Sequence, residues 1–220
     1  MKKIAIIGLG GFGINLAKNL AQEDNIEIIA IDSNKDQVNK IKDMVTKPVT
    51  MDAANKENLI SIGIKDVDCA IVAPGPGLEP GILMVHMLKE LGVPKIFAKA
   101  LSEDHEKILA LVGATEVLYP EKDMAEKMAR QIVAPNLIDY IPLEAGLVIE
   151  EIAPPKFFTG KTLAEIHLRK KYNITVLAIK SIIPQGFTPN PGGEYLVKES
   201  DILVVMGEKK HIDKLHAKIK

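Results

Sequence analysis

The sequence predicts an α/β fold in which a doubly wound parallel β-sheet precedes a smaller α+β module. Six short aliphatic runs carry the prediction, each about as long as a β-strand. Segments with apolar residues at i, i+3 and i+4 separate these runs, as expected for helical crossovers between parallel strands that are buried on both faces. The six runs are "KIAIIG", "IEIIAID", "KPVTM", "CAIVAP", "KIFAKA" and "EVLYP".

Composition limits the class of protein. The chain has 220 residues, of which 47% are hydrophobic and 26% charged, with a net charge of -1. These values fit one or two globular domains. No apolar run approaches the roughly 20 residues that span a bilayer, so we expect a cytosolic protein. Nucleic acid is not an expected partner, because a near-neutral chain lacks the clustered Lys and Arg that neutralise phosphates.

The second half of the chain has a different pattern of predicted secondary structure. Met124, Met128 and Ile132 are spaced four apart and predict a connector helix with one apolar stripe, which Pro135 interrupts. Strand-like runs then alternate with helical segments at "TLAEIHLRKKY" and "EKKHIDKLHAKIK" and with the turn-rich loop "QGFTPNPGGEY". The predicted segments are a sheet domain over 1–120, a connector helix over 121–141 and an α+β subdomain over 142–220.

A glycine-rich turn joins the first strand to the first helix. Gly8, Gly10 and Gly13 form a GxGxxG motif in "AIIGLGGFG". In this context the first glycine permits a tight turn, the second lets the backbone approach phosphate, and the third lets the helix pack on the sheet. Backbone N–H groups at a helix start bind anions. We therefore predict a phosphate-binding loop that also includes Gly11 and Phe12.

Acidic residues end the next two strands. Asp32 lies 24 positions after Gly8, where a carboxylate accepts hydrogen bonds from both ribose hydroxyls and would repel the 2′-phosphate of NADP. Asp52 ends the third strand and is either an adenine contact or the N-cap of a helix that begins near Asn55. ATP, ADP and NAD share the groups recognised here. Ala73, Gly75 and Lys99 complete the candidate nucleotide-binding residues of this edge.

Catalytic groups are harder to find. We expect His86, inside the apolar helix "ILMVHMLKEL", to be packed and His105, in "SEDHEK", to be solvated. His211 and His216 are five apart and miss the i, i+4 spacing of a metal pair on one helix face. The motifs GxSxG, HExxH and GxxxxGK[ST] do not occur. A binding protein is therefore favoured over an enzyme, with an NAD-dependent oxidoreductase as the alternative.

The segment "YPEKDM" allows two interpretations. Glu121 and Asp123 begin the connector helix, where acidic residues ordinarily complement the helix dipole. Glu121 also follows the sixth strand, on the sheet edge where ligands bind in this fold. There its carboxylate could hold a hard cation beside nucleotide phosphates.

Several of these segments together resemble the RCK (regulator of conductance of potassium) proteins, the cytosolic regulatory subunits of Ktr/Trk-type potassium uptake systems. The resemblance covers essentially the whole chain. The glycine motif is common to many families, whereas "YPEKDM" and "LKELG" are more specific. The other matching segments are "AIDSNKDQVN", "DAANKENLISIGI", "VGATEVLYPEKDMAEKMA", "NLIDYI" and "DILVVMGEKKHI".

The resemblance implies a regulatory binding protein that is not an enzyme. In such proteins a Rossmann-like subdomain binds ATP, ADP or NAD(H), and a crossover helix exchanges between the protomers of a homodimer. The dimers form an octameric ring at the inner face of the membrane, where they contact a potassium-transporter subunit. ATP generally favours the active ring and ADP the inactive one. A regulator of a different cation transporter would share the same sequence features.

Individual positions match the family pattern. Gly8, Gly10 and Gly13 match its phosphate loop, Asp32 its ribose carboxylate, and Asp52 with Ala53 its adenine-side segment. Glu121 matches the acidic residue through which some relatives hold Mg²⁺ or Ca²⁺. Several relatives also bind cyclic di-AMP at a C-terminal dimer interface, and the residues in corresponding regions are Leu163, Leu168, Tyr172 and Pro191, which could equally pack a dimer.

Two positions depart from the family pattern. Relatives often carry Arg where this chain has Gly11, and an Arg reaches phosphates with a fork of fixed donors. The segment "APGPGLEPG", residues 73–81, replaces a polar loop that usually contains Asn or Gln. Its prolines have no backbone N–H, so we expect fewer donors at this edge of the site.

Overall fold

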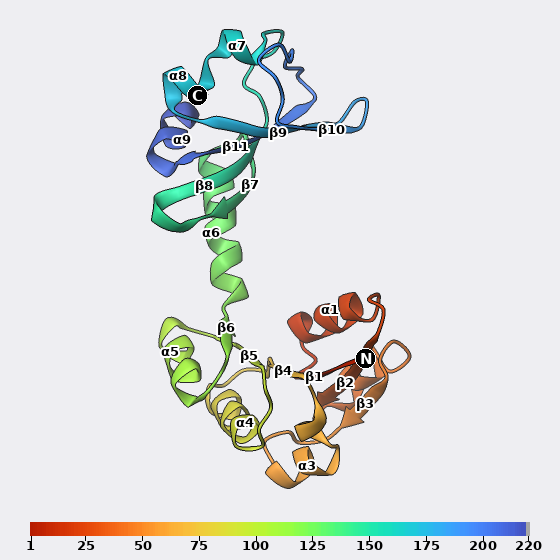
Figure 1. The fold of residues 1–220 in the computed structure, drawn as a ribbon. Helices are drawn as coiled ribbons and strands as arrows, with labels where there is room; N and C mark the ends of the chain where they lie inside the picture. The colour runs from red at the N-terminus through yellow and green to blue at the C-terminus, as the bar shows by residue number, and fades with distance from the viewer. Residues whose placement is uncertain (219–220) are drawn as a thin grey trace. The chain divides into compact units, whose positions relative to one another are not determined.

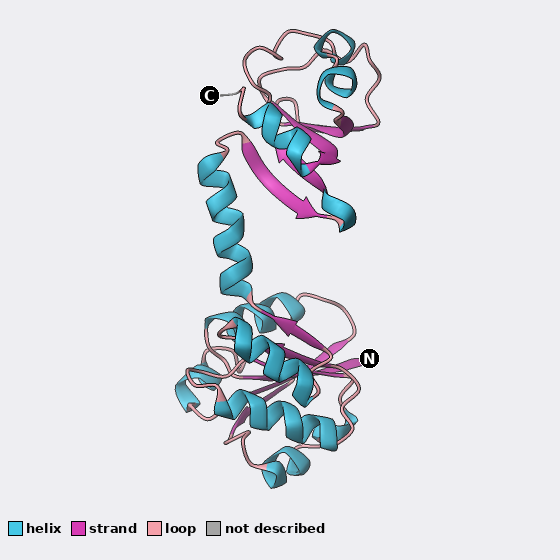
Figure 2. Ribbon diagram, turned by 90° about the vertical axis from the view of Figure 1, so that its left-hand side faces the viewer, coloured by secondary structure: helices cyan, strands magenta, loops and turns pink. Residues whose placement is uncertain are grey.

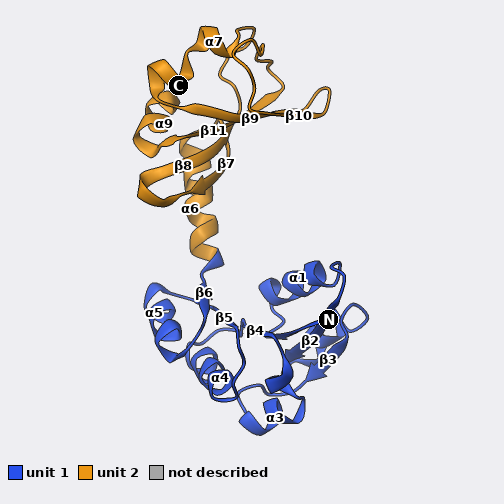
Figure 3. Cartoon of the chain, in the orientation of Figure 1, with its two compact units in different colours: residues 1–120 blue, residues 121–220 orange. Residues whose placement is uncertain are grey.

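The computed structural model describes residues 1–218. The chain divides into two compact units, unit 1 from Met1 to Pro120 and unit 2 from Glu121 to Lys220 (Figure 3). No helix within the described residues is both long enough and apolar enough to cross a membrane.

Unit 1 contains a six-stranded parallel sheet in the order β3-β2-β1-β4-β5-β6, which confirms the predicted doubly wound fold (Figure 1). The order reverses between β1 and β4, and in such sheets ligands bind at the carboxyl ends of the strands near this point. The strands are β1 (Lys2–Ile7), β2 (Ile26–Asp32), β3 (Lys47–Thr50), β4 (Cys69–Val72), β5 (Ile96–Lys99) and β6 (Glu116–Leu118).

Helices cover both faces of this sheet because alternate residues of each strand point to opposite sides. On one face Ile4 and Ile6 of β1 pack with Ala17 of α1. On the other face Ala5 and Ile7 belong to the core that includes buried residues of α4. The helices are α1 (Gly11–Leu20), α2 (Lys35–Asn39), α3 (Lys56–Ser61), the 3-10 helix η1 (Ile64–Asp66), α4 (Glu79–Glu90) and α5 (Glu103–Val112).

Unit 2 contains a five-stranded antiparallel sheet in the order β10-β9-β11-β8-β7, with helices packed on it (Figure 2). The strands are β7 (Leu137–Pro142), β8 (Leu147–Ile152), β9 (Thr175–Ser181), β10 (Gly186–Pro189) and β11 (Asp201–Glu208). The helices are α6 (Pro120–Val133), the 3-10 helix η2 (Glu144–Gly146), α7 (Leu163–Ile166), α8 (Leu168–Tyr172) and α9 (Lys209–His216). The buried face of β11 alternates strictly, as expected for a sheet with one face in the core.

Three local predictions for unit 2 need correction. The connector helix ends at Val133 instead of continuing to residue 141, and residues 137–142 form strand β7. Pro135 explains the end, because a proline disfavours helical backbone at the preceding residue. The helix predicted over 162–172 is split at His167, which adopts left-handed backbone. The loop "QGFTPNPGGEY" contains the edge strand β10. The last two residues of the predicted final helix lie outside the described residues.

Candidate functional site

A cleft of about 410 Å³ opens at the carboxyl edge of the unit 1 sheet. Five of the predicted residues line this cleft: Gly8, Asp32, Asp52, Ala53 and Gly75. Sequence reasoning did not single out Ser33, Met51, Ala54 and Met84, which also line it. Ser33 and Met51 flank the two predicted aspartates, so their places at strand ends were an available signal, whereas Met84 reaches the cleft only through the packing of α4.

The glycines of the motif differ in whether the fold leaves room for a side chain at their positions. Gly8 has φ of +96°, and a Cβ there would lie 2.1 Å from the carbonyl oxygen of Ala73. A Cβ at Gly13 would lie 2.0 Å from the carbonyl oxygen of Gly8. A Cβ at Gly10 or Gly11 would meet no atom of the protein within 4 Å. The fold therefore requires glycine at 8 and 13, whereas space is open around 10 and 11.

The N-terminus of α1 has no side-chain cap. Gly10 is the N-cap residue and no acidic residue lies in the first turn. By contrast, Ser102 caps α5 with its side chain, and three acidic residues follow it. The positive end of the α1 dipole and its first-turn N–H groups are therefore not neutralised by side chains, as in anion-binding helices.

Asp32 is fixed by the backbone on both sides of its carboxylate. The Leu9 N–H donates to Oδ2 at 2.6 Å and the Asn34 N–H donates to Oδ1 at 2.8 Å. A carboxylate has about four acceptor positions, so these two bonds leave capacity for the hydroxyls of a ribose. The bond to Leu9 also ties the end of β2 to the glycine turn.

Asp52 is not the helix cap that one of the two interpretations proposed. The side chain of Asn55 caps α3 by accepting from the Asn58 N–H. Asp52 accepts instead from the Ala54 N–H at 2.9 Å, and its exposed carboxylate lines the cleft together with Asp32. The cleft therefore carries two carboxylates, one at the end of β2 and one just after β3.

The remaining candidates do not line this cleft. Phe12 is half-buried and packs against the core on the α1 face of the sheet. Ala73 is buried and supplies the carbonyl that faces Gly8, while Lys99 ends β5, two strands from β1 in the sheet. Glu121 is exposed in the first turn of α6. Among residues 1–218 no group of three or more His, Cys, Asp or Glu side chains is placed to hold a metal ion.

Residues 73–81, a loop that runs into the first turn of α4, form an apolar wall of the cleft. Pro74, Pro76 and Pro80 all line it, and none of them has a backbone N–H. Gly77 has φ of +109°, a conformation that side-chain-bearing residues rarely adopt. This wall offers few hydrogen-bond donors to a ligand.

The prediction for His105 was wrong. Its side chain is 1% exposed instead of solvated, and burial lowers its pKa. The Leu101 N–H donates to Nδ1 at 3.2 Å, while Nε2 has no hydrogen-bond partner within the described chain. The charged neighbours in "SEDHEK" suggested solvent, but the histidine occupies the inner face of α5 beside Leu109. His86 is also not packed as expected, because its side chain is 56% exposed beside Glu90.

A second cleft, of about 450 Å³, lies in unit 2. Leu163, Leu168 and Pro191, three of the four residues considered for cyclic di-AMP, line it. Tyr172 is absent from its lining, and its ring lies 5.3 Å from the ammonium of Lys218. The cleft also contains the cationic side chains of Arg169 and Lys170, which sequence reasoning missed.

Two domain models of known protein families match this chain, one in each half. The TrkA-N domain model matches residues 4–120 and the TrkA-C domain model matches residues 147–220. The Ktr system potassium uptake protein A of Bacillus subtilis is 36% identical over 96% of this chain and 94% of that protein. The Ktr system potassium uptake protein C of the same organism is 34% identical over 99% of this chain and 97% of that protein.

A solved structure shares the fold at greater distance. The GsuK channel bound to NAD aligns with a TM-score of 0.67 and 19% identity over all of this chain, which spans 39% of that channel's length. The resemblance noted in the sequence is thus confirmed by two domain models and by near-full-length relatives. The chain belongs to the family of Ktr and Trk potassium uptake proteins that combine a TrkA-N with a TrkA-C domain.

Proposed function

We propose that this protein is a cytosolic regulatory subunit of a potassium uptake system and that it binds an adenine nucleotide in the cleft of unit 1. Family membership supports the regulatory role. The uncapped start of α1 beside Asp32 carries the nucleotide assignment, because it combines anion-binding N–H groups with a ribose acceptor. A hydride-transfer enzyme would also need a general acid or base, and the titratable side chains that line this cleft within residues 1–218 are Asp32 and Asp52, to which the proposal gives contacts with the nucleotide.

The proposed ligand is ATP or ADP, with NAD or NADH as the alternative. Gly8, Gly10, Gly11, Phe12 and Gly13 would surround the phosphates. Asp32 would accept from the ribose, while Asp52, Ala53, Ala73 and Gly75 would surround the adenosine. Lys99 and Glu121 would act farther along the sheet edge, Glu121 through Mg²⁺ or Ca²⁺ whose other ligands come from the nucleotide or another protomer. Open space at Gly11 leaves only backbone donors there, so discrimination of ATP from ADP should be modest.

The regulatory step is a shift between ring conformations. A ligand shifts such an equilibrium only by binding the two states unequally. We propose a homodimer that assembles into an octameric ring at the inner face of the membrane and contacts the potassium-transporter subunit. Cyclic di-AMP would bind the second cleft, where Arg169 and Lys170 supply charge for its phosphates.

Equilibrium binding of ATP, ADP and NADH to the full chain tests the nucleotide site. Asp32→Asn should weaken binding of the preferred nucleotide about tenfold or more, because ribose hydroxyls lose a charged acceptor. Asp36→Asn is the matched control, since Asp36 is exposed on α2 and does not line the cleft. Equal binding by both variants would place the nucleotide elsewhere.

Reconstituted potassium uptake with the cognate membrane subunit tests the regulatory role. The rate of potassium uptake should differ between ATP and ADP. The size of the ring, measured by light scattering, should differ between them as well. If both are the same with ATP, with ADP and without nucleotide, the regulatory proposal fails even where the binding experiment succeeds.

A further inference from the structure

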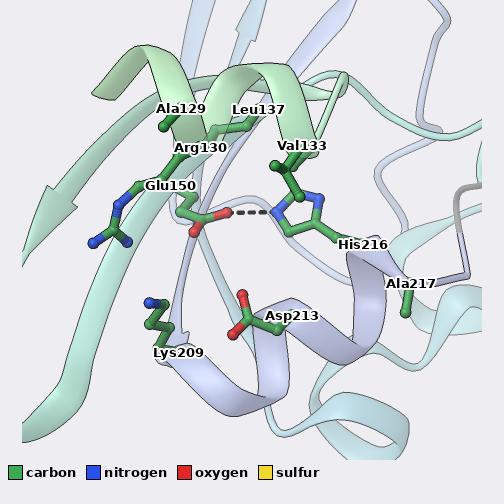
Figure 4. A pocket seen from close by; sticks show the side chains of 10 residues that line it. Ala129, Arg130, Val133, Leu137, Glu150, Lys209, Asp213, His216 and Ala217 are labelled. Carbon is green, nitrogen blue, oxygen red and sulfur yellow. Dashed lines mark hydrogen bonds and ion pairs between the residues drawn. The ribbon is translucent and has the colours of Figure 1, made fainter. Parts of the chain in front are cut away.

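A third cavity, of about 510 Å³, lies within unit 2 between α6, β8 and α9 (Figure 4). One wall is apolar and carries Ala129, Val133, Ala134 and Leu137. The other walls carry side chains of both charges. These residues take no part in the nucleotide cleft or in the second cleft described above.

Glu150 breaks the residue pattern of its strand. The buried positions of β8 are Val148, Glu150 and Ile152. A carboxylate therefore lies on the face of the strand that packs against the core, where apolar residues are expected. Glu150 is 4% exposed. Its Oε2 is hydrogen-bonded to Nε2 of His216 at 2.7 Å. Ionisable groups at such positions cost stability unless they are paired, and they are often retained for function.

The pair with His216 uses only one oxygen of this carboxylate. In Figure 4 the other oxygen of Glu150 points into the cavity, toward the side of α9 that carries Asp213 and Lys209. The side-chain carboxylate of Asp213 has no hydrogen bond or ion pair with another side chain among residues 1–218. Two carboxylate groups therefore offer acceptors to the same cavity.

Cationic groups line the same space. Arg130 is held with its guanidinium carbon 4.0 Å from the centroid of the Tyr140 ring, which leaves its N–H donors available. Lys209 begins α9 and also lines the cavity. A simple anion would meet Glu150 and Asp213, and a simple cation would meet Arg130 and Lys209. A metal ion is not favoured either, because the described residues provide no cluster of three ligands.

We propose that this cavity binds a small amphipathic zwitterion of the amino-acid class. Its ammonium group is held by Glu150 and Asp213, its anionic group by Arg130 and Lys209, and its apolar body by Leu137 and the neighbouring wall of α6. The site joins α6 to α9, so an occupied cavity links the helix that begins unit 2 with the helix that ends it.

Calorimetric titration of the full chain with L-leucine tests the proposal. The comparison ligands are 3-methylbutylamine, which is leucine without the carboxylate, and 4-methylpentanoic acid, which is leucine without the amine. Leucine should bind about tenfold more tightly than either, because each analogue loses one charge-assisted contact. No saturable heat with leucine, or an equal affinity for leucine and one of the analogues, would overturn the proposal.

Two pairs of variants locate the binding. Asp213→Asn should lower the affinity for leucine about tenfold. Glu126→Gln should leave that affinity unchanged, because Glu126 is an exposed residue of α6 outside the cavity. Ala129→Leu should fill the cavity and abolish binding, whereas Ala125→Leu on the same helix should not. If Ala129→Leu instead changes the oligomeric state and leaves leucine binding intact, the cavity is a contact between copies of the chain and the proposal is wrong.

Discussion

The two units build their polar sites in different ways. In unit 1 the cleft combines a glycine turn at Gly8, set by its backbone conformation, with the carboxylate of Asp32, which two backbone N–H groups fix. In unit 2 the cavity of Figure 4 uses side chains from α6, β8 and α9, which are far apart in sequence. The difference predicts that backbone changes will damage the first site and side-chain changes the second.

The largest effect should follow from Gly8→Ala. Its Cβ would clash with the Ala73 carbonyl oxygen and would force a residue with a side chain to adopt φ of +96°. We expect the free energy of unfolding of unit 1 to fall by about 4 kcal/mol, measured by urea denaturation. Gly75→Ala is the control, because a Cβ there meets nothing within 4 Å. Equal stability of the two variants would contradict the backbone account.

His216→Ala should be nearly as damaging in unit 2. It leaves the buried Glu150 carboxylate without its partner, which costs about 3 kcal/mol of unfolding free energy. The double variant Glu150→Leu/His216→Ala should regain most of that loss, because it removes the buried charge. His86→Ala serves as the control at an exposed histidine. A double variant no more stable than His216→Ala would show that lost packing, not the unpaired carboxylate, causes the effect.

Gly10→Ala should separate binding from folding in unit 1. The fold has room for the methyl group, so the free energy of unfolding should change by less than about 1 kcal/mol. Nucleotide affinity should fall about tenfold or more, because the methyl group occupies the space that a phosphate would approach. Unchanged affinity in calorimetry would remove Gly10 from the proposed phosphate loop.

The smallest effect concerns the buried His105. Burial lowers its pKa in the folded protein, so the unfolded chain takes up the proton at a higher pH. Its contribution to stability is therefore fully present above the ordinary pKa of 6.5 and is lost as the pH falls through that value. His105→Asn, which keeps an acceptor for the Leu101 N–H, should reduce the loss of unit 1 stability between neutral and mildly acidic pH. An unchanged pH dependence would exclude His105 as its source.

The parallel sheet was predictable because its central strands, β1 and β4, contain continuous apolar runs and helical patterns separate the strand-like segments. The tight turn at Gly8 and Gly13 and the place of Asp32 at the end of β2 were equally predictable, since a motif of fixed spacing indicates the local backbone geometry. The burial of His105 was not, because the residues around it in sequence are charged and only the packing of α5 turns it inward. The short edge strand β10 escaped prediction because a segment rich in Gly and Pro is also typical of a loop.

The sequence by itself determined the order of the strands along the chain, the glycine turn and the family to which the protein belongs. These features depend on residues that are close together, whose spacing fixes which face or turn they occupy. Only the tertiary structure decided that Asn55 caps α3 and leaves Asp52 in the cleft, and that Glu150 meets His216 across 66 positions of sequence. Contacts between distant segments depend on how helices pack on a sheet, and the pattern of neighbouring residues in the sequence does not predict that packing.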